Sequence, residues 1–342
     1  MNSAPRILVI QTAYLGDVTL TIPLIQQIHE HFPEAQIDYL TAPRAANVIE
    51  TNPYLRNVLP YDKYGWDRGI AGFWRWVKLL RTKQYDYALI IHRSLRSALL
   101  AYLSGIKKRI GFSTSTGAWF FTDIIPYKLT IHEIDRNLQL LLPLGVNCSG
   151  LRPQIYPTPE DEQIIDNFFK EYSLKENENI IGLAPGSAWA TKRMPEEKYA
   201  ELIRLLAERK KSRLILFGGR DDILLCNSIQ QKSGIECIIA AGRFTPRQSA
   251  AALRRVKILV TNDTGALHLG VAAPTRVVAI FGPTVPAFGF YPYGQEHRII
   301  ELSLPCRPCS PHGTKQCPLK HFRCMKDISS AMIFQVIESM IE

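Results

Sequence analysis

The most distinctive polar motif in the chain is TNDTGALHLGVAA, residues 261–273, where a strand-like run meets a helix-like one. Asp263, Thr264 and Gly265 open the expected helix. Free N–H groups at a helix start attract a phosphate, and the Thr264 hydroxyl and the helix dipole add to that attraction. His268 lies four residues after Thr264 and therefore shares its face. The motif indicates a phosphate site, with His268 either contacting the ligand or packed in the core.

A second polar motif, APGSAWATKRMPEEKY, covers residues 184–199 and presents Ser187, Thr191, Lys192 and Arg193 between a strand and a helix. Hydroxyls next to a cation in a strand-to-helix loop suit a diphosphate. The alternative is a solvated basic turn. A third loop, FGPTVPAFGFYP at 281–292, follows another strand and could surround a base or a sugar, although such loops can be purely structural.

A carboxylate follows the first strand in QTAYLGDV, residues 11–18. Asp17 stands where the next helix begins, so it is either an N-cap or a general base that projects toward a ligand. The GxGxxG pattern of dinucleotide-binding loops is absent here, which argues against a nicotinamide cofactor.

The motifs need strands to position them, and β-rich runs alternate with helical patterns along the whole chain. This alternation predicts an α/β fold with parallel sheets covered on both faces. A Pro-rich stretch at 146–160 interrupts it, so we expect two doubly wound, Rossmann-like domains, residues 1–155 and 156–342, that face a cleft. Expected strands are 6–11, 36–41, 57–61, 87–91, 108–112, 179–185, 213–219, 236–241, 257–262 and 276–282. Expected helices are 18–32, 43–51, 70–83, 94–104, 195–209, 221–232, 246–255, 264–272 and 327–341.

The composition is that of an ordinary globular protein, with 342 residues, 46% of them hydrophobic, and a mean hydropathy of −0.05. No apolar run has the length of a membrane span, and the N-terminus resembles a buried strand more than a signal peptide, so we expect a cytoplasmic protein. The net charge of +10 suits anionic partners. Basic residues are spread over both halves without a recognised nucleic-acid module, so nucleic acid is not an expected partner.

Four cysteines gather in the expected loop 305–326, within CRPCSPHGTKQCPLKHFRC. Cys306, Cys309, Cys317 and Cys324 could bind a structural zinc ion as thiolates, with His312 or His321 as substitutes. Reduced packing cysteines are the alternative, because disulfides are rare in a reducing cytoplasm.

With the motifs assembled, the chain resembles the heptosyltransferase family, glycosyltransferase family nine, and most closely its heptosyltransferase II type. The resemblance rests on LVIQTAYLGDV, APGSAWATKRMP, FGGRDD and TNDTGALHLGVAAPTRVVAIFGPT in this order, and it covers nearly the whole chain. It implies a GT-B fold, an inverting mechanism and an ADP-heptose donor bound by the second domain. The implied acceptor is the heptosyl-Kdo-lipid A region of a lipopolysaccharide precursor, bound by the first domain.

The resemblance also implies roles for individual residues. Asp17 would deprotonate the acceptor hydroxyl, and Lys192 would neutralise the leaving diphosphate without a catalytic cofactor. The other donor-binding residues would be Ser187, Thr191, Asp263, Thr264, Gly265 and His268.

Two basic segments fit an anionic, lipid-linked acceptor. GFWRWVKLLRTKQY, residues 72–85, is either an interfacial helix at the inner membrane or a helix packed on the sheet. The second is a basic patch expected to meet acceptor phosphates and carboxylates. It consists of Arg93, Arg96, Lys107, Lys108 and Arg109.

Other functions compete with this interpretation. Within the same architecture, the donor could be another sugar nucleotide, or the enzyme could be an epimerase; preference for ADP over UDP separates these. A zinc-containing nucleic-acid-binding protein is the alternative from another class, and steeply salt-dependent DNA affinity would support it.

Overall fold

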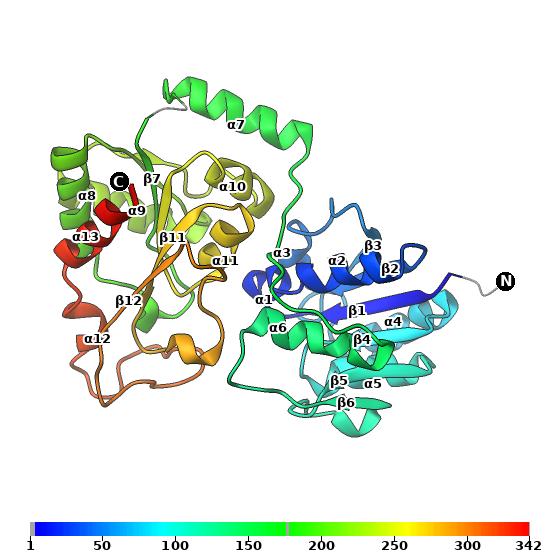
Figure 1. Cartoon of the computed structure of the whole chain (residues 1–342). Helices are drawn as coiled ribbons and strands as arrows, with labels where there is room; N and C mark the ends of the chain where they lie inside the picture. The colour runs from blue at the N-terminus through cyan, green and yellow to red at the C-terminus, as the bar shows by residue number, and fades with distance from the viewer. Residues whose placement is uncertain (1–3, 176–177, 342) are drawn as a thin grey trace. The chain divides into compact units, whose positions relative to one another are not determined.

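The computed structural model describes residues 4–175 and 178–341, and the chain divides into two compact units, Met1–Tyr156 and Pro157–Glu342. Each unit holds a six-stranded sheet whose paired strands run parallel, with helices packed against it (Figure 1). Within the described part of the chain, none of the helices has both the length and the apolar character that crossing a membrane requires.

Unit 1 is ordered as alternating strands and helices around a sheet with the strand order β3-β2-β1-β4-β5-β6. Its strands are β1 (Arg6–Gln11), β2 (Gln36–Thr41), β3 (Leu55–Pro60), β4 (Tyr87–Ile90), β5 (Lys108–Phe112) and β6 (Asp123–Ile125). Its helices are α1 (Leu15–Thr19), α2 (Ile22–His31), α3 (Pro43–Ala46), α4 (Gly69–Lys83), α5 (Leu95–Leu103), η1 (Ala118–Phe120), α6 (Glu133–Leu138) and η2 (Gln139–Leu144).

Both faces of this sheet are buried, as its apolar strands require. One face packs against α4 and α5, where Leu8 and Ile10 of β1 meet Trp76, Val77 and Leu80. Right-handed crossovers put α2 on the opposite face, because the direction of strand addition reverses after β3. The interpretation of residues 72–85 as a helix packed on the sheet is therefore confirmed for the face that carries Trp76, Val77 and Leu80. Trp74, on the same helix, is 46% exposed.

Unit 2 repeats the same topology with the order β12-β11-β10-β7-β8-β9. Its strands are β7 (Ile180–Ala184), β8 (Arg213–Leu216), β9 (Ile238–Ile239), β10 (Ile258–Asn262), β11 (Arg276–Phe281) and β12 (Arg298–Glu301). Its helices are α7 (Pro159–Glu171), η3 (Ala190–Lys192), α8 (Glu196–Lys210), η4 (Arg220–Asp222), α9 (Ile223–Ser233), α10 (Pro246–Leu253), α11 (Gly265–Ala272), η5 (Pro286–Phe288), α12 (Arg323–Lys326) and α13 (Ser330–Ile341).

The two faces of this second sheet can be followed along β11. Val278 and Ile280 belong to a core shared with α8, α9 and α13. The alternate residues Val277, Ala279 and Phe281 pack instead against Leu267 and Val271 of α11. Alternate side chains of β11 thus point to opposite faces of the sheet, and each face is covered by its own layer of helices. The predicted doubly wound α/β fold is confirmed in both units.

The structure differs from the expected elements in several places. The helix expected over 18–32 is split after Thr19, because Pro23 lacks the N–H that a continuous helix would need. The helix expected over 43–51 ends at Ala46.

Other elements were not expected. Helix α7 begins within the stretch interpreted as a linker, and its cap pairs Thr158 with Asp161: the Asp161 N–H donates to Thr158 Oγ1 (3.2 Å) and the Thr158 N–H to Asp161 Oδ2 (3.0 Å). Strands β6 and β12 are short and have weak periodicity.

A buried carboxylate joins β2 to β3 and to the segment that precedes β4. Asp38 on β2 is fully buried and accepts hydrogen bonds from Arg56 Nη2 (2.6 Å), Tyr85 Oη (2.6 Å) and Asn57 Nδ2 (3.0 Å). Burial by itself would raise the pKa of Asp38, but the bonds from Arg56, Tyr85 and Asn57 outweigh it, and the pKa lies below its usual value.

We expect Asp38→Asn to lower the free energy of unfolding by about 2–3 kcal/mol at neutral pH, because it leaves Arg56 and Tyr85 facing an uncharged amide. A depressed carboxyl pKa stabilises the fold above the unfolded value of 3.8 and loses that effect as the pH falls through the folded value. Urea unfolding of both proteins at neutral and acidic pH measures this. The difference should shrink below about pH 4; a pH-independent difference would contradict the assignment.

Candidate functional sites

In unit 2 the predicted residues follow the two strands where the strand order reverses. Strands β7 and β10 are neighbours in the sheet, with Leu183 opposite Val260 and Ala184 opposite Thr261. Ser187 comes three residues after β7, and Asp263 follows β10 directly. Ligands of doubly wound sheets bind at this reversal point, beyond the carboxyl ends of the strands.

The structure joins two of the predicted residues directly. Lys192 Nζ lies 2.6 Å from Asp263 Oδ2, and their side chains are 13% and 9% exposed. Thr284 Oγ1 donates to the same carboxylate oxygen at 2.7 Å. A lysine held in this way has its ammonium fixed in position while it keeps donors available for a second anion. Thr284 belongs to the 281–292 loop, so that loop also contributes to the site.

Asn262 locks the two strand-end loops together, and it was not among the predicted site residues. Its Nδ2 donates to the Pro185 carbonyl at 2.8 Å, and its Oδ1 accepts from the Met194 N–H at 3.2 Å. Asn262 is fully buried, so this cross-link is shielded from water. The available signal was an amide in an otherwise apolar strand, directly before the acidic residue of the motif.

The start of α11 adopts the predicted arrangement. Thr264 is the N-cap, and its hydroxyl accepts from the Ala266 N–H at 3.3 Å. Gly265 is the first helical residue and is half-buried, which leaves this end of the helix open to a ligand. His268 is 6% exposed and lies within the helix. The Thr264 hydroxyl is therefore already used for capping, and the helix N-terminus is the anion-attracting feature.

Thr191 and Ser187 organise the loop that carries Lys192. Thr191 Oγ1 donates to the Thr314 carbonyl (2.7 Å) and accepts from the Thr314 N–H (2.8 Å), so the cysteine-containing segment docks onto this loop. The Ser187 carbonyl accepts from Arg193 Nε at 2.7 Å, and the Ser187 hydroxyl accepts from the Trp189 N–H at 3.3 Å. Their contacts hold the backbone beside Lys192.

The cysteine segment is anchored at its other side as well. The Arg307 guanidinium donates to the Thr284 carbonyl (2.8 Å) and pairs with Glu301 (2.7 Å), and the Cys309 N–H donates to the Pro283 carbonyl (2.8 Å). The segment thus bridges the loop of Lys192 and the loop of Thr284.

The four cysteines of this segment lie near one another. Burial, followed by the neighbouring thiols, raises the pKa of Cys324 to about 11, and Cys306 Sγ lies 3.9 Å from His321 Nε2. Among residues 4–175 and 178–341, however, no three His, Cys, Asp or Glu side chains are arranged so that they could hold a metal ion. The zinc site of Cys306, Cys309, Cys317 and Cys324 therefore stays a prediction from the sequence, as does a substitution by His312 or His321.

In unit 1, Asp17 is not the N-cap that the sequence allowed: the N-cap of α1 is Tyr14, and Asp17 is the third residue of the helix and caps it from there. It lies in α1, half-buried, and its Oδ2 accepts from the Tyr14 N–H at 3.1 Å. The Asp17 charge also contributes to the raised pKa values of Tyr39 and Glu133, in both cases after the larger effect of burial. Capping of the Tyr14 N–H is a structural function of Asp17, and the function of a base stays a prediction from the sequence.

A histidine and a lysine that were not predicted lie at the carboxyl ends of β1 and β4. His92 Nδ1 is 3.0 Å from the hydroxyls of Thr12, Ser94 and Ser97. Lys63 Nζ donates to the Thr12 hydroxyl at 3.3 Å. Burial, then Lys63 and Arg93, lowers the pKa of His92 to about 4, so this histidine is uncharged at neutral pH.

Two predicted acceptor residues join this cluster. Arg93 stacks over the Tyr127 ring, 4.3 Å from its centroid, and Arg96 donates to the Tyr61 hydroxyl and to the Asp67 carbonyl at 3.0 Å. Burial is the larger cause that lowers the pKa of Lys63, and the nearby charge of Arg96 adds to it. This end of the sheet is suited to an anion.

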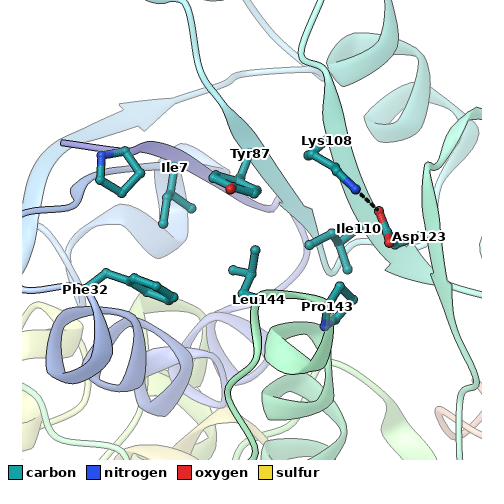
Figure 2. A pocket seen from close by; sticks show the side chains of 9 residues that line it. Ile7, Phe32, Tyr87, Lys108, Ile110, Asp123, Pro143 and Leu144 are labelled. Atoms are coloured by element: carbon teal, nitrogen blue, oxygen red, sulfur yellow. Dashed lines mark ion pairs between the residues drawn. The ribbon is translucent and has the colours of Figure 1, made fainter. Parts of the chain in front are cut away.

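The other three residues of the predicted basic patch lie elsewhere. Lys107, Lys108 and Arg109 precede or begin β5, at the amino ends of the strands, whereas Arg93 and Arg96 follow the carboxyl end of β4. Lys108 pairs with Asp123 at 3.8 Å, and both side chains line a hollow of about 250 Å³ (Figure 2). Arg109 donates to the Phe120 carbonyl at 2.6 Å. The structure therefore separates the expected patch into two groups on opposite edges of the sheet.

Comparisons with known proteins agree with this architecture. The model of glycosyltransferase family 9 (heptosyltransferase) matches residues 73–322. Lipopolysaccharide heptosyltransferase 2 of Escherichia coli (strain K12) is 25% identical over 311 residues, which are 87% of this chain and 88% of that protein.

Solved structures share the fold over the whole chain. A glycosyl transferase family 9 protein from Veillonella parvula DSM 2008 matches with a TM-score of 0.89 at 24% identity, over 100% of this chain and 98% of that chain. An E. coli heptosyltransferase with ADP-2-deoxy-2-fluoro heptose matches with a TM-score of 0.73 at 18% identity, over 98% and 99%. The GT-B arrangement expected from the resemblance is thereby confirmed.

The Thr191–Thr314 contact predicts how the cysteine segment responds to a point change. Thr191→Ala removes all three bonds that the Thr191 hydroxyl makes with Thr314. The Thr314 amide should then exchange with solvent about fivefold faster, because the bond that protects it contributes about 1 kcal/mol net. Thr191→Ser keeps the hydroxyl and should exchange like the wild type. Hydrogen exchange measured by mass spectrometry decides this; equal protection in all three proteins would mean that other contacts hold the segment.

Proposed function

Because the chain belongs to glycosyltransferase family 9, the heptosyltransferases, we propose that it transfers L-glycero-D-manno-heptose from ADP-heptose to the inner core of lipopolysaccharide. The acceptor in this proposal is the heptosyl-Kdo-lipid A region, as for the heptosyltransferase II type. The observation that best supports it is the Lys192–Asp263 pair beside the N-terminus of α11, at the reversal point of the second sheet.

Donor binding is assigned to unit 2. The diphosphate would lie against Lys192 and the N-terminal N–H groups of Thr264 and Gly265, with Ser187, Thr191 and His268 close by. When the anomeric C–O bond breaks, the leaving ADP gains negative charge, and a fixed ammonium with a helix N-terminus stabilises that charge as it develops. These groups supply the stabilisation, so the proposal assigns no cofactor to catalysis.

Acceptor activation is assigned to Asp17. The acceptor hydroxyl oxygen forms the new bond to the anomeric carbon, its proton passes to the Asp17 carboxylate, and the electron pair of the broken bond leaves with ADP. This single displacement inverts the anomeric centre. In this proposal Asp17 both holds the start of α1 and serves as the general base.

Acceptor binding is assigned to the cations at the carboxyl edge of the first sheet. Arg93 and Arg96 were expected from the sequence, and Lys63 joins them because its ammonium lies in the same positive field. Phosphates and carboxylates of an inner-core acceptor are the matching anions. Lys107, Lys108 and Arg109 are left out of this assignment because they lie at the opposite edge.

The transfer itself is the first prediction of this proposal. Incubation with ADP-heptose and heptosyl-Kdo2-lipid A should add the mass of one heptose to the acceptor and release an equal amount of ADP. UDP should compete with the donor far less than ADP. Tight ADP binding without transfer to this acceptor would contradict the proposed acceptor and retain the donor site.

Asp17→Asn distinguishes a base from a cap. The asparagine side-chain oxygen can still accept from the Tyr14 N–H, so the helix start is preserved, but the amide cannot take a proton. We expect kcat to fall about 10²–10⁴-fold with unchanged ADP affinity. Asp17→Ala, which loses both functions, should be no more active than Asp17→Asn. Full activity of the asparagine variant would leave Asp17 with a capping function only.

The two groups of basic residues give matched variants for acceptor binding. Arg93→Gln and Lys63→Gln should each raise the acceptor KM by about tenfold, the value of one charge-assisted hydrogen bond, with ADP affinity unchanged. Lys107→Gln, an exposed lysine at the opposite edge of the same sheet, is the control and should change neither value. Steady-state kinetics with varied acceptor measures both; an effect only at Lys107 would reverse the assignment.

A further inference from the structure

An exposed cluster of large apolar side chains lies at the start of α4 and in the turn before it. Tyr64, Trp66, Ile70 and Trp74 are 82%, 91%, 79% and 46% exposed, and we name these four the aromatic patch. Ile70 and Trp74 stand four residues apart and therefore share one face of the helix. Large aromatic side chains this exposed on neighbouring turns are uncommon in a soluble monomer surface without a partner.

The turn that presents the patch is rigid. The Asp62 carboxylate accepts from the Gly65 N–H (2.9 Å), and the Asp67 N–H donates to the Asp62 carbonyl (2.9 Å). Arg75 donates to the Trp66 carbonyl at 3.1 Å and pairs with the Asp67 carboxylate. The polar groups of the turn are thus used to hold its backbone, while the aromatic side chains point away from the core.

The charges around the patch are mostly positive. Residues 62–85 contain six Lys and Arg side chains and two acidic residues. Of these two, Asp62 accepts from the Gly65 N–H in the turn, and Asp67 is buried against Arg75. Arg68 and Lys78 are exposed beside the patch. Tryptophan and tyrosine together with lysine and arginine are the residues that settle at the level of lipid headgroups, where rings meet the acyl boundary and cations meet anionic phosphates.

The patch is also tied to the proposed acceptor site. Arg96 Nη2 donates to the carbonyls of Asp67 (3.0 Å) and Gly69 (3.4 Å), which border the patch. Lys63 directly precedes Tyr64 in the chain. The surface that carries exposed aromatics therefore continues into the cations assigned to the acceptor.

We propose that the aromatic patch with Arg68 and Lys78 binds the surface of an anionic lipid bilayer. This binding holds unit 1 where a lipid-anchored acceptor presents its sugars. The choice of acceptor rests on the proposed function, but the binding to lipid does not. A second copy of this chain is the competing occupant, and the experiment separates the two.

The test is co-sedimentation of the full chain with vesicles of phosphatidylcholine, with and without phosphatidylglycerol. The wild type should bind the anionic vesicles preferentially. The triple variant Tyr64→Ser, Trp66→Ser, Ile70→Ser should lose at least tenfold in partitioning, because three interfacial side chains are removed. Its control is Leu224→Ser with Trp119→Ser, which removes apolar side chains of similar exposure, 82% and 71%, from other surfaces.

The charges are tested in the same assay. Arg68→Gln with Lys78→Gln should lower binding to anionic vesicles by about fivefold per charge and leave the weak binding to neutral vesicles unchanged. Lys170→Gln with Lys211→Gln, two exposed lysines of unit 2, is the matched control. Unchanged ADP affinity and thermal unfolding would show that all variants remain folded.

Activity on two forms of acceptor separates this proposal from the proposed function. The triple variant should keep its turnover on a deacylated, water-soluble acceptor and lose it on the same acceptor embedded in vesicles. Wild-type-like vesicle binding by the triple variant would overturn the proposal. It would equally be overturned by a wild-type dimer in light scattering that the triple variant abolishes, without vesicle binding by either protein.

Discussion

The constraint on which the rest depends is that all paired strands of each sheet run in the same direction. Every carboxyl end then lies at one edge, and the two neighbouring strands from which the chain winds in opposite directions leave an open crevice at that edge. In unit 1 these strands are β1 and β4, and in unit 2 they are β7 and β10. Asp17, His92, Lys192 and Asp263 all follow one of these four strands.

The cations at the carboxyl edges of the two sheets have different surroundings. In unit 2 the Lys192 ammonium is almost buried, and Asp263 and Thr284 fix its position. An ion pair at this depth loses much of its hydration, so it contributes little net stability and serves better to orient a cation. In unit 1 the cations contact hydroxyls, carbonyls and aromatic rings, and their charges add to burial, the larger cause, in lowering the pKa of His92 and of Lys63. Such a positive field is costly in the free protein and favourable once an anion binds.

The cysteine segment connects two loops of the candidate donor site, whether or not it binds a metal. Arg307 of this segment bonds the loop of Thr284, and Thr314 of the same segment bonds Thr191 in the loop of Lys192. A movement of this segment would shift both partners of the Lys192–Asp263 pair. The aromatic patch has the analogous position in unit 1, because Arg96 connects its turn to the helix that follows β4.

The sequence alone determined the strands and the residues that follow them, because buried parallel strands are continuous apolar runs and polar motifs at their ends stand out. Asp263, Thr264 and Lys192 could be found in this way. The sequence analysis missed strands β6 and β12 and the start of α7, because short strands and a Pro-rich cap carry little periodicity. The sequence analysis also placed Arg93 and Lys108 in one basic patch. In the structure Arg93 follows the carboxyl end of β4 and Lys108 begins the parallel strand β5, so the two lie at opposite edges of the sheet. Only the tertiary structure decided that separation, the burial of His92 and the contact of Thr191 with Thr314, because each depends on segments that meet in space and are distant in the chain.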